Sequence, residues 1–392
     1  MPTLNEIIVH AYENAPAFAR IMDEANLQPD DIHSSDDLAR IPVLPKDRLQ
    51  QLQQQDPPFG GFLTVPVGEL QRIYLSPGPI YDPHGFGDDE ARRAGEEALH
   101  EAGFTANDIA VNTFLYHMVP AGLLLDEALR GLGVTVVPMG PGNTDFQVRV
   151  ILDLQITAYV GTPSFLQMIY DKAGEMGFQL PLQKAFFSAE PYTSSQRAVF
   201  EGEYGLHTAQ AYATADLGVL AYERPGHQGL YVPHNLILQI CDPETGDLLP
   251  DGETGEVVVT SLNPTYPLIR LGTGDLSVMA REIDGDGSER IKLLGLMGRS
   301  GEAIKVRGMF LHPNALRVAL APFDNIAAFQ AVVSREGNRD HVTLNLVLED
   351  GSIDENAVIE AVQTQARLSI NGVAVVDEID GSRLVLDTRT FD

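Results

Sequence analysis

Between about residues 88 and 220, the apolar positions follow two periods in turn. Short apolar runs, such as 108–114 and 156–163, predict strands, and longer segments with apolar residues every three or four positions predict the helices between them. Strands that alternate with helices of about 10 to 15 residues are typical of a parallel sheet with right-handed crossovers. This region is therefore predicted to be an α/β fold.

The pattern is different on either side of this region. Residues 3–26 have apolar positions at helical spacing and predict an amphipathic helix, and a turn, a short helix and a further helix after Pro45 follow. From 229 to 297, short apolar runs separated by tight turns predict antiparallel strands. The last part, from about residue 300, predicts a small α+β unit with a helix, two strands and a second helix.

The segment GRSGE at 298–302 separates these patterns and is the best candidate for a domain boundary. We expect a large domain, residues 1–298, with parallel α/β sheets and an antiparallel β subdomain. A small α+β domain, residues 299–392, is expected to act as a mobile lid. A chain of 392 residues is long enough for this division.

Composition and charge indicate which kinds of binding partner the protein can have. Hydrophobic residues make up 44% of the chain and charged residues 21%, as is usual for globular proteins. The net charge of −29 argues against nucleic acid and against an anionic membrane surface, because both require a basic face. No run of about 18 apolar residues occurs and the N-terminal residues are not typical of a signal peptide, so we expect a cytoplasmic location.

Cys241 is the only cysteine in the sequence, so neither a disulfide framework nor a cysteine metal cluster can form. Its place in an apolar run predicts a packed strand residue without chemistry. Other residue types must therefore carry any reaction.

Four predicted strands end in loops of glycine, proline and other small residues, with the sequences PMGPGN, VGTPS, SAEP and ATADLG. Ligands of open α/β sheets bind beyond the carboxyl ends of the strands, so these loops form the first candidate site. Taken singly, each motif also has a purely structural explanation. Tyr212 can be a core tyrosine, Asp216 a helix cap and Asp275 part of a hairpin turn.

The order and spacing of the motifs carry more information than any one of them. The ordered set is SAEP at 188–191, YATAD at 212–216, GETGEVVVTSL at 252–262, YPLIRLGTGDL at 266–276 and GRSGEAIKVRG at 298–308. It resembles the acyl-adenylate-forming enzymes, and among them the phenylacetate–CoA ligase family. Segments 34–49 and 139–169 resemble the same family, so the resemblance extends from about residue 30 to the C-terminus.

This resemblance implies an activity. Enzymes of the family activate a carboxylic acid: its carboxylate attacks the α-phosphate of ATP, pyrophosphate leaves and an acyl-adenylate forms. The thiol of coenzyme A then attacks the acyl carbonyl. The implied ligands are therefore ATP or AMP, Mg²⁺, coenzyme A and a small, aromatic carboxylic acid, and a homodimer is one implied form of assembly.

The resemblance also implies roles for individual residues. Tyr212 would stack on adenine, Asp275 would accept both ribose hydroxyls, and Arg299 would place a cation near the ribose or phosphate. Asp216 occupies the acidic Mg²⁺ position, which is normally a glutamate. His117 would border the acyl pocket, with a packed core histidine as the alternative. The residues expected around the base are Ser188, Ala189, Glu190, Pro191, Ala213 and Thr214.

One segment departs from the family. The family's phosphate loop is rich in Ser, Thr and Gly and ends in Gly-Lys-Pro, whereas the matching segment here is SPGPIYDP at 76–83. Pro77 and Pro79 each lack the backbone N–H that a phosphate cradle uses. Asp82 stands at the lysine position and reverses the sign of the local charge. We therefore expect a degenerate loop that does not hold pyrophosphate.

The C-terminal part departs as well. The family's lysine that swings over the α-phosphate corresponds to Ser382, and the neighbouring Arg383 is the remaining candidate for a phosphate contact. Gly301 replaces an aspartate or lysine at the hinge. Three interpretations stay open: an atypical carboxylate–CoA ligase, a protein that only binds AMP, acyl-adenylate or acyl-CoA, and a non-enzymatic scaffold of the same fold.

Overall fold

The computed structural model divides the chain into two compact units, Met1–Ser300 and Gly301–Asp392, whereas the sequence suggested a boundary between 298 and 299. The roles expected of the two domains stay predictions. The structure describes residues 2–76, 78–285, 287–299, 304–307, 309–311, 313–337, 339–366, 368–379 and 383–389.

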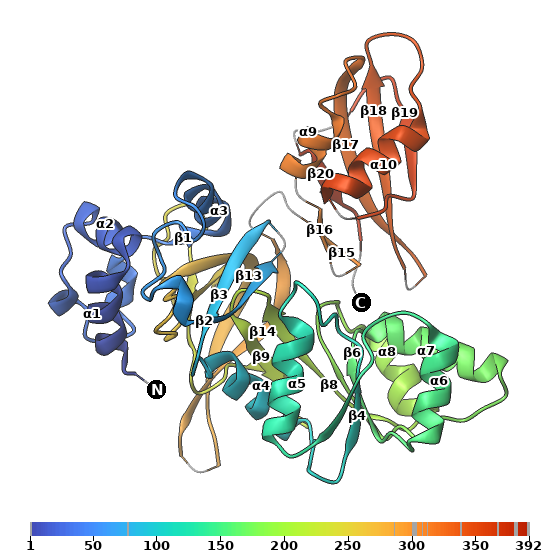
Figure 1. The fold of residues 1–392 in the computed structure, drawn as a ribbon, viewed down its shortest axis with the longest axis horizontal. Coiled ribbons are helices and arrows are strands. Elements are labelled where there is room, and N and C mark those ends of the chain that lie inside the picture. The colour runs from blue at the N-terminus through green and yellow to red at the C-terminus, as the bar shows by residue number, and fades with distance from the viewer. Residues whose placement is uncertain are drawn as a thin grey trace. The chain divides into compact units, whose positions relative to one another are not determined.

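The first unit is built on one continuous sheet, and the parallel strands form one end of it (Figure 1). In spatial order, the parallel strands are β5 (Thr135–Pro138), β4 (Ile109–Asn112), β6 (Ala158–Gly161), β7 (Lys184–Phe187) and β8 (His207–Thr214). Because successive side chains of a strand point to opposite faces, both faces of these apolar strands must be covered. The predicted α/β fold is confirmed for this region.

Helices cover both faces of the parallel strands. On one face, α4 (Glu90–Glu101) and α5 (Ala121–Gly131) form a hydrophobic cluster with alternate residues of β4, β6, β7 and β8. On the other face, α6 (Thr144–Asp153) and α7 (Pro163–Glu175) pack against the remaining strand residues. The helix that follows β7 is only partly α-helical, because α8 (Ser194–Arg197) continues as a π-helix (Ala198–Glu203).

Beyond β8 the sheet becomes antiparallel, as the sequence predicted. The strands follow in the order β9 (Gly218–Glu223), β10 (Leu230–Tyr231), β14 (Glu289–Arg299), β13 (Leu271–Ile283), β12 (Thr254–Thr260) and β11 (Ile237–Cys241). In the β13–β14 pair, Asp275 lies directly opposite Arg299. The antiparallel pairing therefore brings together two residues that are far apart in the sequence.

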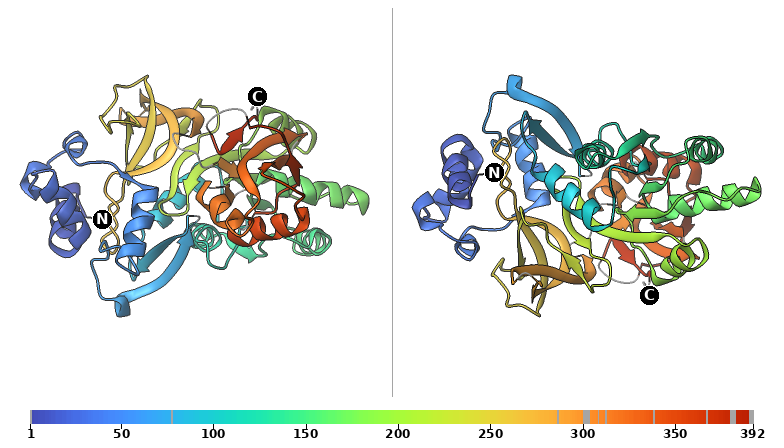
Figure 2. Two further views of the ribbon diagram at one scale, coloured as in Figure 1. Left: turned by 90° about the horizontal axis from the view of Figure 1, so that it is seen from above. Right: turned by 90° about the horizontal axis from the view of Figure 1, so that it is seen from below.

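The N-terminal region lies at one end of the first unit, and α6 and α7 lie at the other (Figure 2). The predicted single helix over 3–26 is wrong: α1 (Leu4–Asn14) and α2 (Pro16–Glu24) are separate. Pro16 has no backbone N–H to continue α1 and therefore starts the second helix. After two short 3₁₀ helices, β1 (Leu44–Pro45) pairs with β13 and leads directly into α3 (Lys46–Gln55).

The segment that resembles a phosphate loop is a β-hairpin. After a 3₁₀ turn (Val67–Glu69), β2 (Leu70–Ser76) pairs antiparallel with β3 (Ile80–Gly85). Residues 80–83 are therefore strand residues, and the prediction of a loop there is wrong. Pro77 lies outside the described residues.

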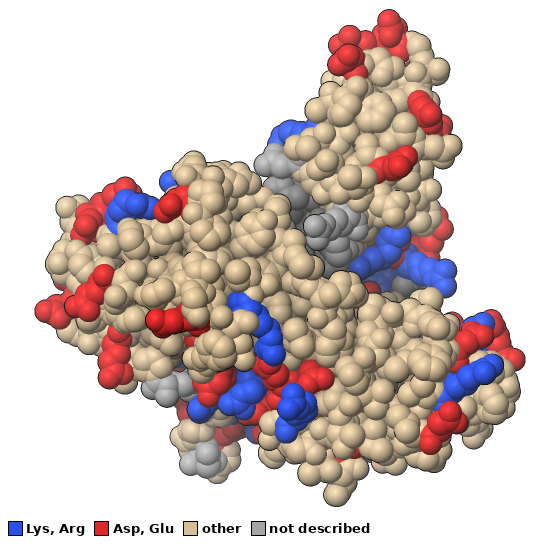
Figure 3. Space-filling view, in the orientation of Figure 1, with Lys and Arg blue, Asp and Glu red and all other residues tan. Residues whose placement is uncertain are grey.

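Charged side chains gather on the first unit over α4 and α5 (Figure 3). The basic residues there are paired with carboxylates: Arg92 contacts Asp89 and Glu96, Arg93 contacts Asp89, and Arg72 contacts Glu127. These arginines are therefore balanced by carboxylates and do not form a free basic patch.

The second unit is the predicted α+β unit. Its main sheet has the order β19 (Gly372–Val375), β18 (Arg339–Leu348), β17 (Ile326–Glu336) and β20 (Val385–Asp387). The helices α9 (Pro313–Leu320) and α10 (Glu355–Ala366) bury their apolar residues against it, and β15 (Ile304–Val306) and β16 (Met309–Leu311) form a small ribbon. Across both units, none of the described helices has the length and apolar character needed to cross a membrane.

Candidate functional site

Three residues of the expected nucleotide half lie in one hydrogen-bonded group. Tyr212, near the end of β8, donates its hydroxyl to Asp275 Oδ2 at 2.7 Å, and Arg299 Nε donates to Asp275 Oδ1 at 2.9 Å. Asp275 and Arg299 are held opposite each other by the β13–β14 register. Their side chains are 13% and 20% exposed, so the group remains open to a ligand on one side.

The chemistry of this group suits a diol next to an anion. Burial, and then the Asp275 carboxylate, raise the pKa of Tyr212 well above its usual value, so the tyrosine is a neutral hydrogen-bond donor. A carboxylate has about four acceptor sites, so Asp275 retains capacity for two ribose hydroxyls. Arg299 adds a permanent positive charge beside it.

The SAEP turn follows β7 and is held to β8. Ser188 is buried and donates its hydroxyl to the Ala211 carbonyl at 2.9 Å. Ala189 has a φ of 73°, a left-handed conformation that is uncommon outside glycine and often marks a functional turn. Glu190 Oε2 accepts from the Ser164 N–H at 3.4 Å, and Pro191 is exposed. The turn thus lies at the same edge of the sheet as Tyr212.

Ala213 and Thr214 are the last residues of β8 and are half-buried. Among the described residues, Thr214 Oγ1 has no hydrogen-bond partner although it is buried. A buried hydroxyl without a partner costs free energy, which favours a ligand or water at this point. The expected base-lining residues are therefore close to one another in the fold, and their role stays a prediction.

Asp216 has a partner that the sequence did not reveal. Its carboxylate is 1% exposed and forms an ion pair with Lys46, the first residue of α3, whose side chain is 22% exposed. The two residues are 170 positions apart. Lys46 lies within the segment that resembles the family's N-terminal part, but nothing in the sequence pattern connected it with Asp216.

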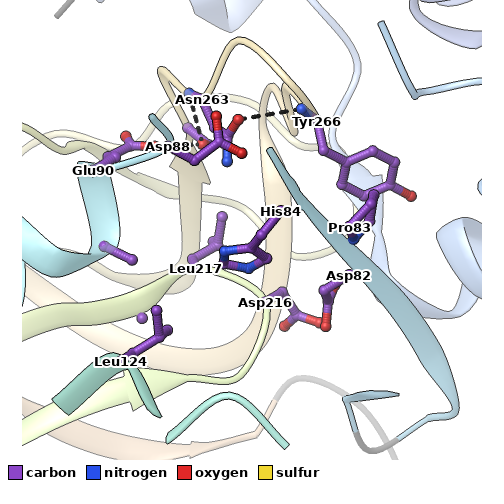
Figure 4. A pocket seen from close by; sticks show the side chains of 13 residues that line it. Asp82, Pro83, His84, Asp88, Glu90, Leu124, Asp216, Leu217, Asn263 and Tyr266 are labelled. Atoms are coloured by element: carbon purple, nitrogen blue, oxygen red, sulfur yellow. Dashed lines mark hydrogen bonds between the residues drawn. The ribbon is translucent and has the colours of Figure 1, made fainter. Parts of the chain in front are cut away.

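Asp82 points toward Asp216 (Figure 4). It is 2% exposed and shares a short hydrogen bond with the Ser76 hydroxyl across the hairpin. Burial, and then the Asp216 charge, raise the pKa of Asp82 well above its usual value. Burial therefore favours the neutral form of the acid at the position where the sequence predicted a reversed charge.

A small cavity of about 30 Å³ adjoins these two carboxyl groups. It has room for one or two water molecules, since one water requires about 10–15 Å³. Residues from the hairpin, α4 and the loop before β13 line it: Asp82, Pro83, His84, Asp88, Glu90, Ala91, Leu124, Asp216, Leu217, Gly218, Ser261, Asn263 and Tyr266. Burial raises the pKa of Glu90 to about 7 and lowers the pKa of His84.

The hairpin is fixed to α3 by two glutamine side chains. Gln53 accepts from the Tyr81 N–H at 2.8 Å, and its amide group donates to the Tyr81 carbonyl at 2.7 Å and to the Tyr266 hydroxyl at 2.9 Å. Gln50 donates to the Gly78 carbonyl at 2.5 Å. The backbone that would have to cradle a phosphate is thus already hydrogen-bonded, which sequence reasoning missed.

The remaining predicted residues lie elsewhere. His117 is exposed, so the alternative of a packed core histidine is wrong, and its neighbour Phe114 is buried. Arg383 is exposed in the second unit, where its carbonyl accepts from Gln330 Nε2 at 2.8 Å. Ser382 and Gly301 lie outside the described residues.

A magnesium ion does not fit Asp216 as the structure has it. Within the described residues, no group of three or more His, Cys, Asp or Glu side chains is placed to hold a metal ion. The Asp216 carboxylate is already neutralised by Lys46. Mg²⁺ at a nucleotide is usually held by one or two carboxylates together with phosphates and water, so the feature that argues against the ion here is the Lys46 ammonium already paired with that carboxylate.

Proteins of known function that resemble this chain include AMP-binding enzymes, as the nucleotide-binding residues predicted from the sequence suggest. The chain matches the AMP-binding enzyme family over residues 115–265. It is 29% identical to the phenylacetate–coenzyme A ligase of Thermus thermophilus over 361 residues, which is 88% of this chain and 80% of that one. The phenylacetate–coenzyme A ligase of Escherichia coli is 28% identical, with the same shares covered.

Solved structures show the same fold. A crystal structure of 2-hydroxyisobutyryl-CoA ligase in complex with 2-HIB-AMP and CoA has a TM-score of 0.89, with 24% identity, 98% of this chain and 88% of that chain covered. The fold and motifs together define an adenylate-forming enzyme with an AMP-binding domain. Within that class, the chain is similar over most of its length to the phenylacetate–CoA ligases.

Proposed function

We propose that this chain is an atypical adenylate-forming ligase that joins a small carboxylic acid to the thiol of coenzyme A. The hydrogen-bonded group of Tyr212, Asp275 and Arg299 is the observation that carries the proposal. It presents an aromatic ring, a carboxylate with free acceptor sites and a permanent cation at one edge of the sheet. These are the groups that an adenine, a ribose and a phosphate require.

The proposed reaction has two steps. A carboxylate oxygen attacks the α-phosphate of ATP and pyrophosphate leaves; the thiol sulfur then attacks the acyl carbonyl and AMP leaves. In both steps Asp275 would hold the ribose, while Arg299 would balance phosphate charge. Relatives named for phenylacetate favour an aromatic acid, and the loop of Phe114, Tyr116 and His117 is its proposed border.

The hairpin favours a second candidate function, that of a protein that binds AMP or an acyl-adenylate without forming it. The backbone of Tyr81 is already hydrogen-bonded to Gln53, and Asp82 replaces a phosphate-facing lysine. Loss of one such charge-stabilising group typically lowers a rate by about 10² to 10³. The contribution of Arg383 to phosphate contact stays a prediction, as does a homodimer.

Calorimetric titration separates these functions, because it needs no knowledge of the acid. We expect AMP to bind, with loss of binding in Arg299→Ala. If ATP binds at least as well as AMP, a screen of aromatic acids for pyrophosphate release should find a substrate. If AMP binds and ATP does not, the second function holds. If neither nucleotide binds, both candidates are wrong and a scaffold of the same fold remains.

A further inference from the structure

We propose that the Lys46 ammonium takes the place of a divalent cation at Asp216, so that nucleotide binding at this site does not require Mg²⁺. This inference rests on the proposed function, since it concerns the same nucleotide site. It assigns to Lys46 the role of a phosphate-binding residue. It also assigns to Asp216 the role of orienting that lysine, in place of ligating a metal.

The first argument is the ion pair itself. The Asp216 carboxylate is 1% exposed while the Lys46 side chain is 22% exposed, so solvent or a ligand reaches the lysine and not the acid. An ammonium group has three donors. One of them is used by Asp216, which leaves Lys46 able to donate to a phosphate oxygen without leaving the pair.

The second argument is the mismatch with Mg²⁺. The ion would have to displace Lys46 or lie beside it, and two adjacent cations repel each other strongly at low dielectric. Mg²⁺ at a nucleotide is usually held by one or two carboxylates together with substrate phosphates and water, and here the Asp216 carboxylate is already paired with Lys46. Asp82, which points toward it, is engaged by Ser76 (Figure 4).

The third argument is charge conservation at the cavity. The hairpin has lost the lysine that the family places at position 82, and Lys46 of α3 pairs with Asp216, which lines the cavity together with Asp82. One carboxyl group of the cavity therefore has a side-chain cation beside it, and that cation belongs to a helix that Gln53 fixes to the hairpin. A lysine held in this way can contact a phosphate group in the absence of a metal ion.

The test measures AMP affinity by calorimetry in EDTA and in Mg²⁺ for the wild type, Lys46→Met and Lys46→Arg. We expect the wild-type affinity to agree within about twofold between the two buffers, and Lys46→Met to bind AMP at least about tenfold more weakly in EDTA. Lys46→Arg should retain most of the affinity, which shows that the charge matters and excludes misfolding. Arg48→Met is the matched control, because Arg48 is exposed on the same helix and its side chain donates to Gln51.

A second measurement does not depend on the nucleotide. Titration with Mn²⁺, followed by electron paramagnetic resonance, should find no bound ion in the wild type and a new site in Lys46→Met, where Asp216 and Asp82 lose their cation. Tight Mn²⁺ binding by the wild type, or AMP binding that disappears in EDTA, would overturn the inference. Absence of nucleotide binding in both buffers would overturn the proposed function, and the Mn²⁺ result would still decide whether Lys46 occupies the cation position.

Discussion

Glu90 provides a direct test of the electrostatics of the cavity. It starts α4, accepts from the Leu262 N–H at 2.8 Å and from the Ser261 hydroxyl at 2.7 Å, and lines the same cavity as Asp82 and Asp216. Burial, despite these two hydrogen bonds, raises the pKa of Glu90 from 4.5 to about 7. The substitution Glu90→Gln keeps the size of the side chain and removes the titration.

The size of the effect of Glu90 on the free energy of unfolding follows from the shift in its pKa. One pH unit corresponds to about 1.4 kcal/mol, so a change from 4.5 to about 7 amounts to about 3 kcal/mol. Between these values the native state keeps a proton that the unfolded chain releases, so the free energy of unfolding falls as the pH rises. This decrease in the free energy of unfolding is complete above about pH 7 and absent below about pH 4.5. Glu90→Gln should not show it.

Urea denaturation from pH 4.5 to 8, followed by circular dichroism, measures this difference. The wild type and Glu90→Gln should agree near the acidic end and diverge by about 3 kcal/mol at pH 8, with the variant more stable. Glu24→Gln, an exposed glutamate at the end of α2, is the control and should follow the wild type throughout. Parallel curves for the wild type and Glu90→Gln would show that Glu90 is ionised in the folded protein and refute the argument.

Three further predictions concern the hairpin and the nucleotide group. Asp82→Asn should raise the free energy of unfolding at pH 8 and leave it almost unchanged near about pH 3, because the raised pKa of Asp82 destabilises the fold only above 3.8, where the unfolded chain releases the proton; urea titration at the two pH values tests this. Gln53→Leu should cost about 2 kcal/mol or more, since it leaves the Tyr81 backbone without partners; unchanged amide exchange in the hairpin would contradict it. Asp275→Asn should weaken AMP binding about tenfold by calorimetry, and equal affinity would remove Asp275 from the site.

The periodic parts of the fold could be predicted from the sequence. The alternation of apolar runs and helical segments between 88 and 220 predicted the parallel strands, since strands buried on both faces must be apolar throughout. The break at Pro16 was missed because the apolar spacing continues across it. The strand at 80–83 was missed because two prolines and a glycine just before it favour a loop.

Contacts between distant segments could not be predicted in the same way. The ordered motifs indicated Tyr212, Asp275 and Arg299 individually, and the hydrogen bond between Asp275 and Arg299 follows from the β13–β14 register, whereas Tyr212 reaches Asp275 from β8. Lys46 and Gln53, by contrast, reach the site from α3. No local pattern marks a lysine or a glutamine whose partner lies elsewhere in the fold.

These contacts bear on the choice between AMP and ATP. If Asp82 is neutral, Lys46 balances Asp216, and the charge of a bound phosphate must be met by the remaining donors of Lys46 and by Arg299. That is sufficient for the single phosphate of AMP. The two further phosphates of ATP would face the hairpin, where the Tyr81 backbone is occupied by Gln53 and Pro79 has no N–H. We therefore expect AMP to bind more tightly than ATP, and Asp82→Lys to narrow the difference; a wild type that prefers ATP would show that another element contacts the outer phosphates.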